Sequence, residues 1–531
     1  MRNIINLFLC LLLFSCSEGK EQLPFLQVRN GIFIDENGHQ VILNGINHVV
    51  KNPELKYLHN NDEQLFKDFQ KYGFNCIRYG IIWDGLEPEP GVINENYLKE
   101  IDKRVKWAED NGIYLILDMH QDLYGRKFSD GAPEWATLTD NLPHQTGDVW
   151  SDSYLISPAV QRAFDNFWQN KPASDGTGIQ DHYINVWKTL AARYADSPSV
   201  AGFDIMNEPF MGSPAPSIFG KLLEGYAIAL TQKGEKIDNP EMLAATFSNE
   251  QERIKILEKL DDKELFRQIL KSASEPVKDF EENILSPFYQ KTRDAIRSTG
   301  SRQVLFLEHC YFCNMGIPSY FKVPVQEDGK EDSNCAYAPH GYDLVTDTEA
   351  MDSPGYNRTE VIFEQIFENG KDKNLPVWIG EWGAFYMGKS YIEPAMHITN
   401  MIEKSLSGQT YWCWWENIET QDYFHHALSR AYPMNSGARI AEYNNNNNCF
   451  SCKWETDKEN STIKFYIPQL RKIADNDIKL SPECETERIY IDKDYDSGYL
   501  ILKIKRGKGE LNIISHYTDT LPPGVTQNHI N

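Results

Sequence analysis

The chain has 531 residues, a formal net charge of −24 and a hydrophobic fraction of 41%. This composition excludes disorder over most of the chain, and the length indicates either two or three units or one large barrel with an appendage. The negative charge excludes nucleic acid as a partner, because no basic stripe is available for phosphates. Aromatic residues make up 12% of the chain, which suits carbohydrate binding as well as a large core.

The N-terminal residues 1–16 predict an export signal rather than a part of the fold. Arg2 precedes an apolar run, Ile4 to Phe14, that is too short to span a bilayer. The run closes with Leu13-Phe14-Ser15-Cys16, which resembles the lipobox of bacterial lipoproteins. We therefore expect lipidation of Cys16 and a lipoprotein held at the outer membrane or cell surface. The alternative is an ordinary cleaved signal peptide, with a secreted or periplasmic product.

Strand-like runs alternate with helical segments from residue 24 to residue 435. An Asn37-Gly38 pair between apolar runs predicts a hairpin near the start. Eight later runs have strand character: 41–43, 76–80, 114–118, 202–206, 304–307, 335–338, 377–379 and 410–414. Amphipathic stretches between them, such as 63–72, 97–111 and 182–194, predict helices. This pattern predicts an α/β fold, a (β/α)8 TIM barrel, with a doubly wound sheet as the alternative.

Two segments depart from simple βα repetition. The interval from Phe210 to Arg302 is too long for one crossover helix, and residues of about 215–285 predict a helical insertion. It would lie either over the barrel mouth or away from it. The asparagine run 444–448 indicates a linker or an exposed loop. The runs 461–466, 488–491 and 499–504 then predict an antiparallel β-sandwich over residues 445–531.

Two glutamates follow the ends of apolar runs. Glu208 stands in Asn207-Glu208-Pro209, and Glu381 begins Glu381-Trp382-Gly383. Strand ends form the mouth of a barrel, where catalytic groups lie. Glycoside hydrolysis needs two carboxyl groups, one as acid/base and one as nucleophile or base. We expect Glu208 and Glu381 to be this pair. Glu308, also at a strand end, is a reserve candidate with an expected structural role.

Further polar residues follow strands at the same rim. A buried Arg78 would hold a carboxylate nucleophile ionised, and Asn207 would bond the sugar 2-hydroxyl. Two pairs have the i, i+2 spacing that turns both side chains to one side of an extended segment: His120 with Asp122, and His340 with Tyr342. Such imidazoles and carboxylates would also suit a metal. The Trp-rich strand ends and the Asn-Glu-Pro triplet favour a sugar instead.

Eight cysteines lie beyond residue 16, and an oxidising compartment permits disulfides among them. The Cys310/Cys313 and Cys449/Cys452 pairs have no partner pair at zinc-finger spacing. We therefore expect these cysteines to be core residues or a bridge, and we expect neither a metal nor a cofactor.

Asn207-Glu208-Pro209 and Glu381-Trp382-Gly383 on this strand pattern resemble family five of the glycoside hydrolases, in a clan of retaining enzymes. Residues 118–122, Asp-Met-His-Gln-Asp, followed by residues 130–136, Asp-Gly-Ala-Pro-Glu-Trp-Ala, resemble the endoglycoceramidases, which release the intact glycan from a glycosphingolipid. Residues 44–47 with Lys51, residues 338–342, and Tyr411-Trp412 resemble the first-, sixth- and eighth-strand sites of these enzymes. The resemblance implies that Lys51 and Trp412 also bind substrate.

The resemblance implies a retaining β-glycosidase that hydrolyses the bond between glycan and ceramide by double displacement. Glu208 would be the acid/base and Glu381 the nucleophile, with carboxyl groups about 5–5.5 Å apart rather than the roughly 6.5–9.5 Å of inverting enzymes. One alternative is a β-glucosidase acting on glucosylceramide, steryl or other hydrophobic glucosides. A second is a non-catalytic glycan-binding lipoprotein. The expected partners are the glycolipid and the anchoring membrane, and we expect a monomer.

Overall fold

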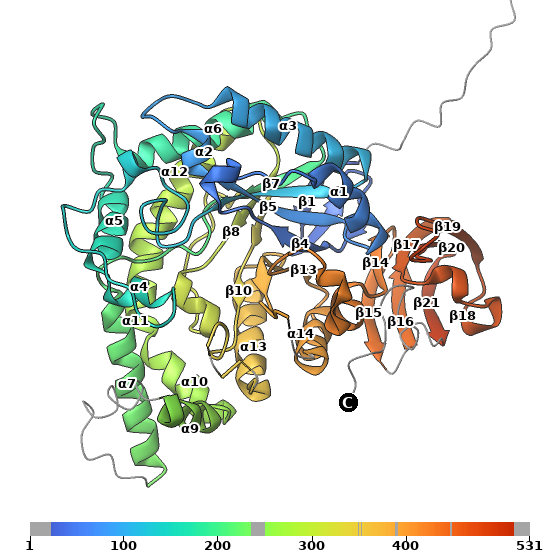
Figure 1. Ribbon diagram of the computed structural model, residues 1–531. Helices are drawn as coiled ribbons and strands as arrows, with labels where there is room; N and C mark the ends of the chain where they lie inside the picture. Colours follow the sequence, from blue (N-terminus) through green and yellow to red (C-terminus); the bar gives the residue numbers. More distant parts are fainter. Residues whose placement is uncertain are drawn as a thin grey trace, which may run out of the picture.

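The computed structural model describes residues 23–234, 250–348, 350–351, 353–387, 391–446 and 449–514. Eight parallel strands form a barrel in the order β11-β13-β4-β5-β6-β7-β8-β9 (Figure 1). A bridge between Tyr337 and Val377 closes the ring. The strands are β4 Asn44–His48, β5 Cys76–Ile82, β6 Tyr114–His120, β7 Val200–Asp204, β8 Val304–Leu307, β9 Cys335–Tyr337, β11 Trp378–Ile379 and β13 Gly408–Tyr411. The predicted (β/α)8 barrel is confirmed.

The first barrel strand lies later in the sequence than we predicted. The expected strand 41–43 is wrong, because Gln40–Val41 is β3 and pairs with β14 (Tyr432–Ser436) outside the barrel. The barrel strand is β4, which carries the buried polar residues Asn44, Asn47 and His48. These polar side chains interrupt the apolar pattern of β4, so the nearest continuous apolar run lies just before this strand, at residues 41–43.

Helices surround the barrel because their apolar residues recur every three or four positions and face the strands. In α3 the buried side chains include Leu98, Ile101 and Val105. The Asn94 side chain caps this helix by accepting from the Tyr97 N–H at 3.2 Å. The helices of the described barrel are α1 Asp62–Lys71, α2 Trp83–Leu86, α3 Glu95–Asp110, α4 Asp152–Ile156, α5 Pro158–Trp168, α6 Ile179–Tyr194, α12 Ser286–Arg297, α13 Tyr356–Asp372 and α14 Ile392–Lys404.

The barrel interior is apolar at its N-terminal end and charged at its C-terminal end. One core cluster joins interior side chains such as Ile116 and Phe306 to Leu26 and Phe33 of the N-terminal hairpin. This hairpin, β1 Leu26–Arg29 with β2 Ile32–Asp35, thus covers the bottom of the barrel. Polar chemistry is confined to the opposite end.

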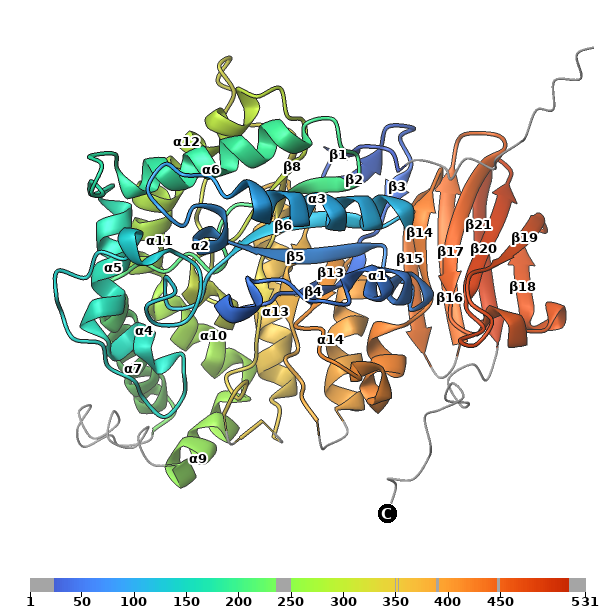
Figure 2. The same cartoon turned by 45° about the horizontal axis from the view of Figure 1, so that its top comes forward.

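The helical insertion after β7 stands beside the barrel. It contains α7 Ala215–Gln232, α9 Glu250–Leu260, α10 Lys263–Ser272, α11 Ser274–Phe280 and the π-helical turn η3 Glu281–Leu285. Figures 1 and 2 show α7, α9 and α10 grouped together at one end of the molecule, and α10 packs against α7 and α13. No described residue of this insertion lines the main cavity. The described part of the insertion therefore lies outside the cavity and packs on the barrel helix α13.

A β-sandwich beside the barrel contains two antiparallel sheets (Figure 2). The sheet orders are β1-β2-β3-β14-β17-β20-β19 and β15-β16-β21-β18, so the N-terminal hairpin extends one of them. The remaining strands are β15 Arg439–Asn446, β16 Cys449–Thr456, β17 Ser461–Ile467, β18 Ile478–Ser481, β19 Glu485–Tyr490, β20 Gly498–Ile504 and β21 Gly507–Ile514. Phe450, Phe465 and Leu511 are among its buried core residues. The predicted sandwich architecture is confirmed, although its C-terminal strands begin at Tyr432 rather than at 445 and the N-terminal strands β1, β2 and β3 join one of its sheets.

The asparagine run is not a linker in its described part. Residues 444–446 belong to β15 and pair with β16. The buried Asn445 donates from Nδ2 to Glu403 Oε1 and to the Ala431 carbonyl, both at 2.9 Å, and its own carbonyl accepts from Arg430. Side-chain hydrogen bonds to α14 thus replace the apolar contacts that a strand usually makes. Residues 447–448 lie outside the described residues.

The export signal and the end of the expected sandwich lie outside the described residues, and membrane spans and disulfides can be judged only within them. The export signal at 1–16, with Cys16, lies outside them, as do residues 515–531 of the expected sandwich. In the described segments no helix has the length and apolar character needed to cross a membrane. The cysteines of the described chain are all free thiols, so none of them forms the bridge that we considered.

Candidate active site

Arg78 is the hub of the barrel mouth. It points from β5 into the barrel and is fully buried. Its guanidinium contacts six acceptors at 2.6–3.1 Å: Asn47, Asp118, Asp204, Asn207, Glu308 and Glu381. A planar donor fork of this kind holds several carboxylates in fixed positions at once.

Glu381 begins the short strand β12 (Glu381–Trp382), which pairs with β10 (His340–Gly341). Its Oε1 accepts from Arg78 Nη1 at 2.6 Å, and its Oε2 accepts from the Tyr342 hydroxyl at 2.8 Å. These two donors fix the orientation of the Glu381 carboxyl group at the mouth.

Glu208 follows β7 with a left-handed backbone, φ +46°, and its N–H donates to Glu308 Oε2 at 2.7 Å. Its Oε1 accepts from Asn314 Nδ2 at 2.6 Å and from His340 Nδ1 at 3.0 Å. Burial, followed by the charges of Glu381 and Asp122, raises the pKa of Glu208, although His340 opposes the shift. Glu208 thus holds its proton more strongly than a free glutamic acid, whereas Glu381 accepts from two donors, Arg78 and Tyr342.

The two carboxyl groups are close together. One oxygen of Glu208 and one of Glu381 lie within 4.8 Å of each other, and both are also within that distance of a His340 nitrogen. This proximity fits the carboxyl separation of about 5–5.5 Å in retaining glycosidases better than the roughly 6.5–9.5 Å of inverting ones.

His340 and Glu308 support the pair from below. Burial alone would lower the pKa of His340, but the charges of Glu308 and Glu381 hold it well above its usual value. The resulting imidazolium directs Nδ1 at Glu208 and places Nε2 3.3 Å from Glu308 Oε1. Glu308 accepts from Arg78 and from the Glu208 backbone, so its contacts are those of a structural carboxylate.

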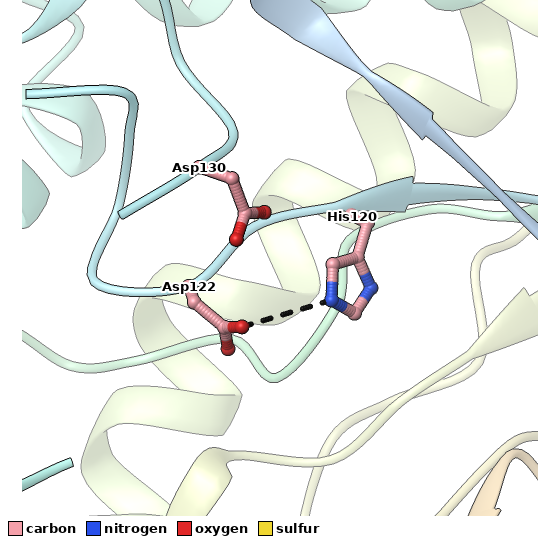
Figure 3. Close-up of side chains that lie close together, drawn as sticks. All are labelled: His120, Asp122 and Asp130. Atoms are coloured by element: carbon pink, nitrogen blue, oxygen red, sulfur yellow. Dashed lines mark ion pairs between the residues drawn. The ribbon is translucent and has the colours of Figure 1, made fainter. Parts of the chain in front are cut away.

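A second polar cluster contains His120, Asp122 and Asp130 (Figure 3). His120 Nδ1 donates to Asp118 at 2.8 Å, and its Nε2 lies 3.9 Å from Asp122. Burial opposes the protonated form of His120, but Asp118 raises its pKa to about 10. Lys51 donates to Asp122. Burial would raise the pKa of Asp122, but the charge of Lys51 outweighs it and the pKa is lowered. The pKa of Asp130 is raised, by burial and by the charge of Asp122.

Trp412 follows β13 and faces this cluster. Its ring stacks on His120, with centroids 5.2 Å apart and an interplanar angle of 14°, and the Lys51 ammonium lies 4.6 Å from the ring centroid. An aromatic face beside charged hydrogen-bonding groups suits a sugar, which has apolar faces and hydroxyl edges. The cluster thus offers a wall for a pyranose ring.

These residues surround one cavity of about 350 Å³. Eight of the ten predicted site residues line it: Lys51, His120, Asp122, Asn207, Glu208, Tyr342, Glu381 and Trp412. Arg78 and His340 lie beneath this layer, completely buried, and act through the glutamates. The structure therefore brings all ten predicted residues together.

Three groups in the described chain have metal-like spacing: His120 with Asp122 and Asp130, Glu208 with His340 and Glu381, and Asp118 with Asp204 and Glu308. A side-chain cation of the protein already contacts each group. Lys51 donates to Asp122 in the first group, and Arg78 pairs with Asp118 in the third. In the second group, Glu381 pairs with both Arg78 and the His340 imidazolium.

Sequence reasoning missed several cavity residues. Asn314, which contacts Glu208, lies in the 3-10 turn η4 (Tyr311–Met315), where no strand-end pattern marked it. Trp150 and Asp347 meet across the mouth, with the indole Nε1 donating to Asp347 Oδ2 at 3.1 Å. Asp130 carried a signal, because it begins the block 130–136 that resembles a glycolipid-cleaving family.

Comparison with known proteins decides the family. The family model "Cellulase (glycosyl hydrolase family 5)" matches residues 34–418, most of the chain. The chain belongs to glycosyl hydrolase family 5. This membership confirms the family that the Asn-Glu-Pro and Glu-Trp-Gly motifs predicted and makes the protein a member of a glycosidase family.

Individual relatives match a shorter part. The chain is 35% identical to an endoglycoceramidase of Cyanea nozakii over 208 residues, which are 34% of this chain and 40% of that protein. It is 30% identical to endoglycoceramidase I of Rhodococcus hoagii over 203 residues, 36% of this chain and 39% of the relative. The chain thus spans about 40% of the length of these curated relatives. The solved endo-glycoceramidase II from Rhodococcus sp. shares the fold, with a TM-score of 0.67 and 22% identity over 92% of this chain and 99% of that one.

Proposed function

We propose that this protein is a retaining β-glycosidase that cleaves glycosphingolipids between the glycan and the ceramide. The observation that carries the proposal is the pair Glu208 and Glu381, with oxygens within 4.8 Å in one cavity. The opposite environments of these groups, one favouring a proton and one an anion, support separate roles as acid/base and nucleophile.

In the first step, a Glu381 oxygen attacks the anomeric carbon while the bond to the leaving oxygen breaks. Glu208 gives its proton to that oxygen, and a covalent glycosyl ester with Glu381 forms. In the second step, Glu208 takes a proton from water, whose oxygen attacks the same carbon and releases Glu381 as a carboxylate. Two inversions retain the anomeric configuration.

The glycan would lie against the wall formed by Lys51, His120, Asp122 and Trp412. Asn207 uses one amide hydrogen for the Gln121 carbonyl at 2.9 Å, which leaves the second for the sugar 2-hydroxyl. Such a contact strengthens as positive charge develops at the anomeric carbon.

An amphiphilic aglycone is supported by the rim of the cavity. Trp150 and Tyr386, which line it, are 46% and 45% exposed, and the adjacent Met387 is 74% exposed. Both Trp150 and Tyr386 contact Asp347, so these side chains lie close together, and a contiguous apolar patch open to solvent marks a surface that binds apolar partners. The relatives named as endoglycoceramidases point to the same substrate class.

Product identification tests this proposal. The protein is incubated separately with a ganglioside, lactosylceramide and glucosylceramide, and the released sugar is identified. Free oligosaccharide and ceramide are expected; glucose alone from glucosylceramide would instead indicate a glucosidase of hydrophobic glucosides. No release from any substrate, with binding retained, would indicate a non-catalytic glycan-binding protein. Glu381→Gln is the matched control and is expected to release nothing.

We also propose that the chain is an exported, monomeric lipoprotein anchored through Cys16. The lipobox-like segment 13–16 supports this, and a membrane anchor would bring the cavity to a glycolipid surface. The full chain is expressed in a bacterium and its N-terminal peptide is analysed by mass spectrometry. A diacylglyceryl group on Cys16, lost together with membrane association in Cys16→Ser, is expected. An unmodified, soluble product would contradict the anchor.

A further inference from the structure

We propose that Asn314 and His309 are positioning residues that hold the transferable proton of Glu208 on its Oε2 atom. The proposal rests on the proposed role of Glu208 as acid/base. Neither residue belongs to the ten predicted from the sequence, and both are buried beside the glutamate pair.

The first step concerns the two oxygens of Glu208. Oε1 accepts two N–H donors, Asn314 Nδ2 at 2.6 Å and His340 Nδ1 at 3.0 Å. An oxygen that faces two donors has no acceptor toward which to direct a proton of its own. The carboxyl proton therefore belongs on Oε2, the oxygen left available for a leaving group in the cavity.

The second step concerns the orientation of the Asn314 amide. His309 Nε2 lies 2.9 Å from Asn314 Oδ1, and His309 Nδ1 lies 2.7 Å from the Tyr337 hydroxyl. Burial, together with the charge of His340, lowers the pKa of His309 to about 3, so its ring is neutral. A neutral imidazole donates from one nitrogen only. If Nε2 carries the hydrogen, the Asn314 NH2 group must face Glu208.

The third step concerns the tautomer of His309. The Tyr337 hydroxyl accepts from Asn369 Nδ2 at 3.2 Å, and two acceptors are available for its own hydrogen: His309 Nδ1 and the Ser319 hydroxyl, which gives its hydrogen to Glu281. We assign the Tyr337 hydrogen to His309 Nδ1, because the two atoms are only 2.7 Å apart. Asn369 is oriented in turn, because its Oδ1 accepts from Gln365 Nε2 at 3.0 Å. Every bond from Asn369 through Tyr337, His309 and Asn314 thus donates toward Glu208. Hydrogen bonds aligned in one direction reinforce one another.

The chain of donors has a chemical consequence. It stabilises the ionised form of Glu208, as the imidazolium of His340 also does. It opposes the carboxylates that face Glu208, namely Glu381, Glu308 and Asp122, whose charges favour the proton. Because Glu208 must lose a proton in one step and regain it in the next, a neutral donor on Oε1 limits how strongly the proton is held.

Two measurements test the proposal. In the native protein, 15N NMR of labelled histidine reports the tautomer of His309, assigned by the signal missing in His309→Gln. A neutral ring protonated at Nε2 is expected from pH 5 to pH 8, and a charged ring or an Nδ1–H tautomer would overturn the proposal. This measurement does not depend on whether an Asn314 variant folds.

The second measurement titrates Glu208 by 13C NMR of labelled glutamate, assigned by difference from Glu208→Gln. Asn314→Leu keeps the side-chain size but removes the donor, and is expected to raise the titration midpoint by about one to two pH units. Asn166→Leu is the matched control. Asn166 is a buried asparagine that donates to the Leu138 carbonyl, and its loss is expected to leave the midpoint unchanged. An unchanged midpoint in Asn314→Leu would overturn the proposal. Absence of hydrolysis by the native protein would refute the proposed function, while both NMR measurements would still decide the inference.

Discussion

Replacing Arg78 by lysine keeps the positive charge of the hub but removes its geometry. The guanidinium donates five hydrogen bonds, to Asn47, Asp204, Asn207, Glu308 and Glu381, whereas an ammonium has three hydrogens, so at least two of these bonds are lost. At about 1.5 kcal/mol net for each lost bond from a charged donor, the free energy of unfolding falls by about 3 kcal/mol. Because the bond to Glu381 is among those at risk, we expect kcat to fall by about 100-fold or more through misplacement of the nucleophile.

The control for this prediction is Arg104→Lys. Arg104 is also buried and also contacts a carboxylate, Asp62, at 2.7 Å, but it lies on α3 outside the barrel mouth. Urea unfolding and steady-state hydrolysis of an aryl β-glucoside are measured for both variants. We expect similar losses of stability, with a loss of kcat in Arg78→Lys alone. Equal kcat values for the two variants would refute the view that Arg78 positions Glu381.

Three further outcomes are expected. Glu381→Gln should lower turnover at least 10³-fold with little change in the thermal unfolding midpoint. In Glu381→Gly, azide added as an external nucleophile should restore product formation, and the product should have inverted configuration. Since the pKa of Glu208 is raised and its acid form protonates the leaving group, kcat/KM should fall as pH rises through that pKa, and a flat profile would contradict the assignment. Arg358→Met breaks the bidentate pair with Asp343 and the bond to the Leu257 carbonyl. Because Asp343 lines the cavity, substrate binding should weaken, and steady-state kinetics should show a larger rise in KM than fall in kcat.

The βα repetition predicted the barrel because seven of the eight expected runs overlap barrel strands that alternate with amphipathic helices. The eighth strand, β4, is buried but not apolar throughout, since Asn44 and Asn47 occupy strand positions. Polar residues in that strand bond the barrel mouth: Asn47 Nδ2 donates to the Gly380 carbonyl at 2.8 Å. Hydrophobic patterning alone therefore places such a strand a few residues early.

The candidate site could be predicted where its residues end strands. Glu208, Glu381, His120 and Tyr342 were expected for this reason, and all four line the cavity. Asn314 could not be expected in this way, because it reaches the cavity from a turn whose position depends on tertiary contacts. The segment that contains this turn is held in place by the buried Glu281 carboxylate, which accepts from the backbone N–H groups of Cys310, Tyr320 and Phe321.

The insertion illustrates a limit of a different kind. Periodicity predicted helices over residues of about 215–285, but not which surface they cover. Leu257 of α9 packs with Val345 and Ala350, next to the cavity-lining residues 346–348. The contacts of Arg358 join the same helix to Asp343. The insertion therefore acts on the cavity through the loop that follows β10.

The protonation of Glu208 follows from the charge balance of the whole mouth. Arg78 contacts four carboxyl groups, and one of them, Asp204, has a pKa raised well above its usual value by burial and by the charge of Glu308. More carboxyl groups than cations share this dry end of the barrel, so some must stay protonated. Glu381 accepts hydrogen bonds from both Arg78 and Tyr342. Glu208 contacts no arginine, and it is the member of the pair that can hold and release the proton.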